Sequence, residues 1–110
     1  MTDIELLDDI ELLELAAKAA DIYETLHQTE DGFEFIGSYD IWNPLTDDGD
    51  ALRLAVTLKI DVAHTNIHSP QVHALADAKV QVWEDSGSDP LAATRRAIVR
   101  AAAEIGRRMT

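Results

Sequence analysis

The sequence predicts a small α+β domain in which helices pack against a mostly antiparallel sheet of three to four strands. Three observations indicate this class. The chain has 110 residues, which suits a single domain with one core, here residues 1–110. Its apolar content of 46% suits a folded interior and is too high for a disordered acidic tail. Segments with helical spacing at both ends enclose segments that alternate or are rich in β-branched residues.

The first element is a helix predicted from Asp3 to about Leu26. Its apolar residues recur at helical spacing. They are Leu6, Ile10, Leu13, Ala17 and Ala20. Either Thr2 with Glu5 or Asp8 with Glu11 can form the capping box at its N-terminus.

A duplicated pentad bears on where this helix begins, because the sequence DIELL at residues 3–7 returns at residues 9–13. An offset of six residues is roughly 600° of helical rotation, so the two copies face about 240° apart. They cannot present the same side to one core. We therefore expect the helix proper to begin near Asp8, with residues 1–8 as an extension that frays or packs on a partner.

Two elements are expected in the middle of the chain. After Gly32, the segment Phe33–Tyr39 alternates like a strand. Asn43-Pro44 is a turn signal. Asp50–Lys59 then has the pattern of a short helix, with one side made by Leu52, Val56 and either Ala55 or Lys59.

Three extended segments and a helix complete the chain. Ile60–Ile67 is rich in β-branched residues and is followed by a break at Ser69-Pro70. The further strand candidates are Val72–Ala76 and Lys79–Glu84, and Asp85–Ser88 is a predicted loop. Asp89 suits the N-cap of the last helix and Pro90 its first position. Its predicted buried stripe is Leu91, Ile98, Ile105 and Met109, with Ala101 and Ala102 between.

Three segments together resemble the phage ABA sandwich domain family, whose members are small proteins of phages and prophages. They are WNPLTDDGDALRLAV (Trp42–Val56), ELLELAAKAA (residues 11–20) and DPLAATRRAIVRAAAEIG (residues 89–106). The resemblance spans nearly the whole chain and implies a three-layer α/β/α sandwich. The doubled pentad departs from the family pattern. The family carries no established catalytic residues, so none are transferred.

The charge of −12 is unevenly distributed. Residues 1–50 hold 15 acids and one lysine, and residues 51–110 hold eight bases and six acids. An acidic body repels phosphate backbones, so we expect no direct nucleic-acid binding and a macromolecular partner with a basic surface. With no cysteine there is no disulfide or thiolate zinc site. The N-terminus is acidic and no apolar run approaches about 20 residues, so we expect no membrane association and the cytoplasm of a bacterial host.

The acid cluster Asp47-Asp48-Gly49-Asp50 is interpreted as a helix N-terminus. An EF-hand loop needs acids at positions one, three and five with glycine at six, and that spacing is absent. Thr46 or Asp47 is better placed as the cap, with acids in the first turn opposing the helix dipole.

Trp42 and Asn43 lie directly before this cap. Trp42 either packs over the edge of the sheet or offers a stacking platform or a binding hot spot. Arg53, in the helix that follows, can serve as a fork for a phosphate or a carboxylate.

Four histidines raise the question of zinc: His27, His64, His68 and His73. His64 and His68 can lie on one side of a strand with Asn66 between, but no third ligand completes a tetrahedral site. We predict no metal and no cofactor.

The basic residues concentrate in the last helix, at Arg95, Arg96, Arg100, Arg107 and Arg108. We expect Arg96, Arg100 and Arg107 to share one outward face, with Glu104 pairing with Arg100 at i,i+4. This face is either solvated or binds a phosphate-bearing molecule or an acidic subunit.

The sequence has no Gly-x-Ser-x-Gly and no glycine-rich phosphate loop, so we expect no enzyme. The leading hypothesis is a phage or prophage accessory protein that interferes with a host process such as a defence system. It would block a basic protein surface or sequester a nucleotide-like signal between Trp42, Arg53 and the C-terminal arginines, and an oligomer is possible in the second case. The alternatives are a component of a phage particle or replication complex, and a metal-dependent hydrolase.

Overall fold

The computed structural model describes residues 4–30, 32–38, 40–65, 70–76 and 79–109. These residues form two short 3₁₀ helices, three α-helices and six strands. In chain order they are η1 (Ile4–Leu6), α1 (Asp9–Ala19), η2 (Tyr23–Thr25), β1 (Leu26–Thr29), β2 (Gly32–Phe35), β3 (Ile41–Trp42), α2 (Asp48–Leu58), β4 (Asp61–His64), β5 (Gln71–Ala76), β6 (Val80–Asp85) and α3 (Pro90–Arg108). The predicted α+β class is confirmed.

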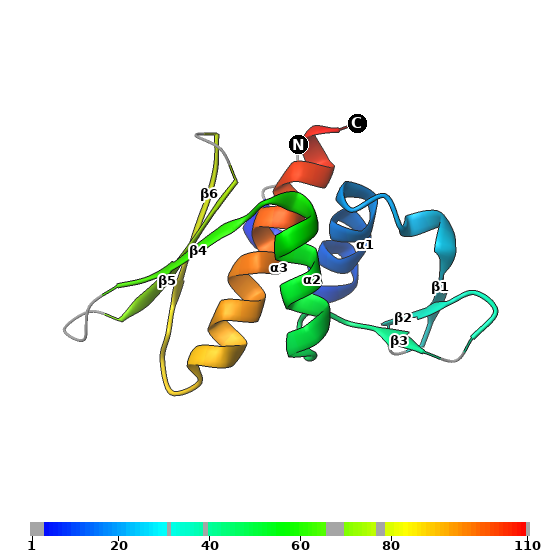
Figure 1. The fold of residues 1–110 in the computed structure, drawn as a ribbon, viewed down its shortest axis with the longest axis horizontal. Helices are drawn as coiled ribbons and strands as arrows, with labels where there is room; N and C mark the ends of the chain where they lie inside the picture. The colour runs from blue at the N-terminus through cyan, green and yellow to red at the C-terminus, as the bar shows by residue number, and fades with distance from the viewer. Residues whose placement is uncertain (1–3, 31, 39, 66–69, 77–78, 110) are drawn as a thin grey trace.

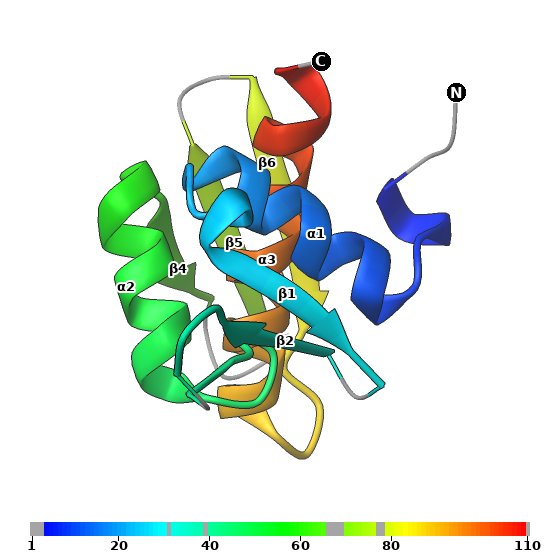
Figure 2. The same cartoon turned by 90° about the vertical axis from the view of Figure 1, so that its right-hand side faces the viewer.

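The strands form two antiparallel sheets of three strands each, in the orders β1-β2-β3 and β4-β5-β6. Figure 1 shows the sheets at opposite ends of the longest axis, with the three α-helices between them. Figure 2 shows the first sheet in front of α1 and the second behind α3. The sandwich that the resemblance implies has one sheet between helices, whereas here the helices lie between two sheets.

Helix α3 is the centre of the molecule. It packs against α1, α2, β5 and β6, and its alanines Ala97, Ala101, Ala102 and Ala103 are fully buried. Small side chains let these elements approach the helix from several sides, and the helix is therefore buried around most of its circumference.

The predicted apolar stripe of α3 is confirmed only in its middle. Ile98 is buried and Ile105 is half-buried, but Leu91 and Met109 are exposed. The two exposed residues lie near the ends of the helix, beyond the positions where neighbouring elements cover it.

Helix α1 begins at Asp9, which confirms the start near Asp8 that the duplicated pentad predicts. Asp8 is the N-cap and forms a capping box with Glu11, each side chain accepting from the other residue's N–H at 2.9 and 3.2 Å. Thr2, in the alternative box, lies outside the described residues. The preceding extension includes η1, and its Ile4 and Leu7 pack against the core of this same chain.

The predicted end of this helix at Leu26 is wrong, because α1 ends at Ala19. The backbone reverses at Asp21, which has φ of 60°, and Leu26 instead pairs with Phe35 across β1 and β2. The predicted strand Phe33–Tyr39 is shorter, since Ile36, Gly37 and Ser38 form a turn, and Tyr39 lies outside the described residues.

Helix α2 begins two residues before its predicted start. Its buried side is formed by Ala51, Leu54 and Ala55, while Leu52 and Val56 are exposed at 65% and 69%. The predicted side of Leu52 and Val56 therefore faces away from the core.

The remaining strands follow the predicted order. β4 occupies the first part of the predicted segment Ile60–Ile67, of which residues 66–67 lie outside the described part. β5 and β6 match their predicted segments to within one residue at each end. None of the described helices is long and apolar enough to cross a membrane.

Candidate functional site

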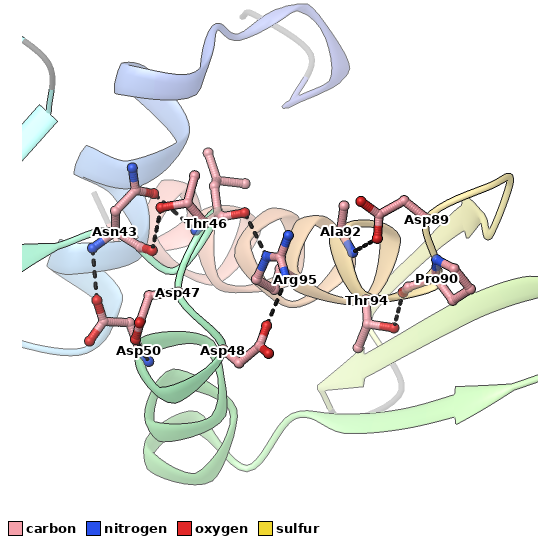
Figure 3. Close-up of polar contacts among 11 residues, drawn as sticks. Asn43, Thr46, Asp47, Asp48, Asp50, Asp89, Pro90, Ala92, Thr94 and Arg95 are labelled. Carbon is pink, nitrogen blue, oxygen red and sulfur yellow. Dashed lines mark hydrogen bonds and ion pairs between the residues drawn. The ribbon is translucent and has the colours of Figure 1, made fainter.

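The turn between β3 and α2 positions the residues that the sequence singles out. The Asn43 side chain accepts the N–H of Leu45 at 3.0 Å, and the Asn43 carbonyl accepts the N–H groups of Thr46 and Asp47 at 3.1 and 2.9 Å. The Asp47 carboxylate then caps α2 by accepting the N–H of Asp50 at 2.8 Å. These local hydrogen bonds, several of which are drawn in Figure 3, confirm the predicted turn and cap.

Asp50 places a buried carboxylate at the base of this turn, with 8% of the residue exposed. It accepts the N–H of Asn43 at 2.9 Å (Figure 3) and Nη2 of Arg53 at 2.7 Å. Arg53 Nη2 also lies 3.9 Å from Asp47. A buried carboxylate needs such donors, because losing hydration without replacing it costs several kcal/mol.

Two adjoining cavities open beside Asp50 and Arg53. One, of about 520 Å³, has walls that include Asp40, Asn43 and Asp47. The other, of about 280 Å³, is mainly apolar, and Asp50 and Arg53 line both. We call the two cavities together the α2 cleft.

The apolar part of the α2 cleft is lined by side chains from four segments. Ile22 precedes η2, Phe35 ends β2 and Leu54 lies on α2. Trp42 on β3 also lines it, although only 4% of this residue is exposed. Trp42 therefore serves as packing between the first sheet and α2, and it does not present an open face on which a base could stack.

The rest of the acid cluster is used in contacts between elements. Asp48 accepts Nη1 of Arg95 at 2.6 Å, and Arg95 Nε donates to the Leu45 carbonyl at 2.8 Å (Figure 3). Arg95 therefore ties α3 to the start of α2. Within the described residues, no group of three or more His, Cys, Asp or Glu side chains is arranged to hold a metal ion.

The histidines lie on different strands. His27 is on β1, His64 ends β4 and His73 is on β5. His68 lies outside the described residues, so its predicted place beside His64 is not visible.

The prediction that Arg100 faces outward and pairs with Glu104 is wrong. Arg100 is only 9% exposed. Its guanidinium pairs with Glu84 and donates to the Trp83 carbonyl, both on β6. Packing of α3 against the second sheet turns this side chain away from its helical neighbour.

Glu104 instead binds two arginines of the last turn. Arg107 pairs with it, and Arg108 Nε donates to it at 2.9 Å. The Arg107 hydrogen bond is the main reason that the pKa of Glu104 lies below the usual value for a glutamate, with Arg108 adding to the effect.

The structure does not bring the C-terminal arginines to Trp42 and Arg53. Arg96 pairs with Asp9 at the start of α1 at 3.2 Å, while Arg107 is held in the last turn of α3. The predicted site residues are thus divided between the α2 cleft, which has Trp42, Asn43 and Arg53, and separate ion pairs along α3.

One aromatic pair was not predicted from the sequence. His73 on β5 and Trp83 on β6 are opposite each other in register and stack at 4.0 Å with 6° between their planes. Trp83 is half exposed, on the face of the second sheet that α3 does not cover. If the two predicted strands are paired antiparallel with Ala76 opposite Val80, His73 lies opposite Trp83.

The described walls of the α2 cleft carry carboxylates, one guanidinium, an amide and apolar side chains. Carboxylates in excess of cations favour a positively charged group over a phosphate. Comparisons of the chain with protein-family models, curated proteins and solved structures gave no match.

Proposed function

We propose that the chain is a non-enzymatic binding protein that docks on the basic surface of a protein partner through the α2 cleft. The observation that carries this proposal is the pairing of a carboxylate-rich cavity with an apolar one. Asp40, Asp47 and Asp50 face one cation, Arg53, which two of them already engage. An incoming arginine or lysine would meet carboxylates, and an adjacent apolar side chain would meet the apolar cavity.

The biological setting that we propose comes from the resemblance to phage ABA sandwich proteins. In that setting the chain is a phage or prophage accessory protein that blocks a basic surface of a host protein, for example in a defence system. The charge asymmetry supports blocking, because 15 of the 21 acids lie in residues 1–50, which include β1, β2 and the turn between β3 and α2.

Sequestration of a nucleotide-like signal has less support. It requires Trp42, Arg53 and the C-terminal arginines to converge, yet Trp42 is buried. Arg96 and Arg100 bind Asp9 and Glu84 on other elements. The described lining of the α2 cleft has no surplus of positive charge for a phosphate.

The test is calorimetric titration of the full chain with a peptide that alternates arginine and leucine. The cleft variant is Asp40→Asn with Asp47→Asn, since asparagine preserves the helix cap. The matched control is Asp61→Asn with Asp85→Asn, which removes the same charge from exposed positions of the second sheet.

We expect the cleft variant to weaken binding at least tenfold and the control variant to change it less than twofold. Binding should also fall with salt, because exposed charges are screened over about 8 Å at physiological ionic strength. Equal weakening by both variants would mean that only the overall charge matters, and would refute the α2 cleft as the docking site.

The same variants then serve as baits in a bacterial lysate, read by mass spectrometry for proteins and small molecules. A host protein retained by the parent and control chains but lost by the cleft variant would support the blocking function. Retention of one nucleotide by all three would support sequestration instead.

A further inference from the structure

A cavity separate from the α2 cleft lies at the C-terminal end of α2, opposite its N-cap Asp47. It has a volume of about 380 Å³ and is lined by apolar side chains from four elements. Leu58 comes from the last turn of α2, Ala76 and Val80 from the facing ends of β5 and β6, and Ile105 and Met109 from the end of α3. Figure 1 shows that the C-terminal ends of α2 and α3 lie at the same end of the molecule. The volume is in the range typical of small-molecule sites.

The rim of this cavity carries Lys59, Lys79 and Arg108, and its described lining includes no acid. Three of the nine basic residues thus gather at one cavity in a chain that has 21 acids. The described lining of the cavity therefore carries positive side chains, whereas the chain as a whole is negative.

The Glu104 carboxylate binds Arg108 of this rim, and it does not cancel the positive charge. It binds Arg107 as well as Arg108, so the three side chains together remain cationic. Lys59 makes no ion pair with any other residue that the structure describes. An anion at the rim would therefore meet Lys59 and a cluster with net positive charge.

Lys59 also occupies an unusual position. It is the C-cap residue of α2 with φ of 56° and ψ of 45°, a left-handed conformation in which glycine is the usual residue. Here the side chain of a lysine is carried to the edge of the cavity.

We propose that this cavity binds a small amphipathic anion, whose apolar body lies against Leu58, Val80 and Ile105 and whose carboxylate lies between Lys59 and Arg108. A medium-chain carboxylic acid has this chemistry. Shape and charge favour it over a neutral ligand, which leaves the cations unused, and over a cation, which they repel. The proposal is independent of the α2 cleft and does not rest on the proposed function.

The first test is calorimetric titration of the full chain with octanoate, decanoate, butyrate and octylammonium. Each buried methylene should tighten binding by roughly fourfold, so decanoate, with two more methylenes, should bind about sixteenfold tighter than octanoate, and butyrate should bind too weakly to detect. Octylammonium binding as tight as octanoate, or no heat with octanoate and decanoate at millimolar concentration, would overturn the proposal.

The second test uses the double variant Lys59→Gln with Arg108→Gln. Its matched control is Lys18→Gln with Arg96→Gln. This variant removes the same charge from cations that pair with Glu14 and Asp9 and do not line the cavity. Octanoate affinity should fall at least fivefold in the first variant and less than twofold in the control. Equal affinities in the parent and the Lys59 variant would refute the site.

A third measurement needs no variant and covers the case in which a substitution disturbs folding. Octanoate is titrated into the isotope-labelled chain and followed by NMR. Shifts should concentrate at Leu58, Val80 and Ile105. Shifts centred on Trp83 would place the ligand on the second sheet instead. Self-association through Met109 without octanoate would make the cavity a contact between copies of the chain. Either result would refute the proposal.

Discussion

The carboxylate of Asp50 lies 2.7 Å from Nη2 of Arg53, yet the two side chains differ sharply in exposure. Only 10% of the Asp50 side chain is exposed, against 72% of that of Arg53. Asp50 also accepts the N–H of Asn43 at 2.9 Å. The carboxylate therefore belongs to the structure of the β3–α2 turn, whereas the guanidinium covers it from the solvent side.

This asymmetry predicts unequal effects of substitution. Asp50→Ala leaves the Asn43 N–H without its acceptor and should lower the free energy of unfolding by about 1–3 kcal/mol. Arg53→Ala should lower it by less than about 1 kcal/mol, because an exposed ion pair contributes little and water can hydrate the uncovered carboxylate. Urea denaturation of both variants measures this. A larger loss for Arg53→Ala would contradict the assignment of Asp50 as the structural member.

Trp42 gives the second prediction. Because it is buried between the first sheet and α2, Trp42→Ala should lower the free energy of unfolding by about 3–5 kcal/mol, and Trp42→Phe by clearly less. Chemical denaturation followed by circular dichroism provides the measurement. If Trp42→Ala kept its stability but lost binding of the arginine–leucine peptide, Trp42 would be a contact residue rather than packing.

The features predicted well from the sequence are those that depend on neighbours along the chain. The Asp8–Glu11 capping box, the cap at Asp47 and the start of α3 at Asp89 each need only residues three positions apart. A cap forms wherever a short polar side chain reaches the free N–H groups of the first turn, so its pattern is visible in the sequence.

The features that the sequence did not reveal depend on distant segments. β1 has four residues and β3 has two. Such strands carry little periodicity and exist because they pair with β2. Arg100 likewise turns toward Glu84 because α3 packs on β6, and no spacing within α3 indicates this. The cavity near Lys59 joins residues of α2, β5, β6 and α3, so only the fold assembles it.

The crossing of α1 and α3 gives the third prediction. A Cβ added to Gly106 would overlap the Leu15 carbonyl oxygen and lie 2.9 Å from its carbonyl carbon. Because backbone cannot yield as a flexible side chain can, Gly106→Ala should lower the free energy of unfolding by about 1–3 kcal/mol. Thermal or urea denaturation measures the loss.

Gly49→Ala is the matched control, since it places the same methyl group on a helix. There the nearest atoms are the ends of Asp47 and Arg53 side chains at 3.2–3.3 Å. These can move, and alanine favours the helix by about 1 kcal/mol, so this variant should be neutral or more stable. An unchanged free energy of unfolding for Gly106→Ala would contradict this prediction, because it would show that α1 and α3 can move apart without a loss of stability.

The last turn of α3 gives a prediction on pH. The pKa of Glu104 is lowered in the folded chain, first by the Arg107 hydrogen bond and then by Arg108, against the opposing effect of burial. A carboxyl with a lowered folded pKa stabilises the fold fully above its unfolded value of about 4.3. The contribution is lost as pH falls through the folded pKa. The parent chain should therefore exceed Glu104→Gln in stability at pH 7, and the difference should shrink below about pH 4.3.

The arginine variants determine which donor dominates. Arg107→Gln should raise the pKa of Glu104 more than Arg108→Gln does, because the Arg107 hydrogen bond is the larger cause. NMR titration of the Glu104 carboxyl carbon measures both shifts. Since Arg108 lines the cavity near Lys59 and Arg107 does not, Arg108→Gln should weaken octanoate binding more than Arg107→Gln, which only lowers the charge of the cluster around Glu104. If the two variants raised the pKa of Glu104 equally, the carboxylate would be shared evenly and Arg108 would be less available to a ligand.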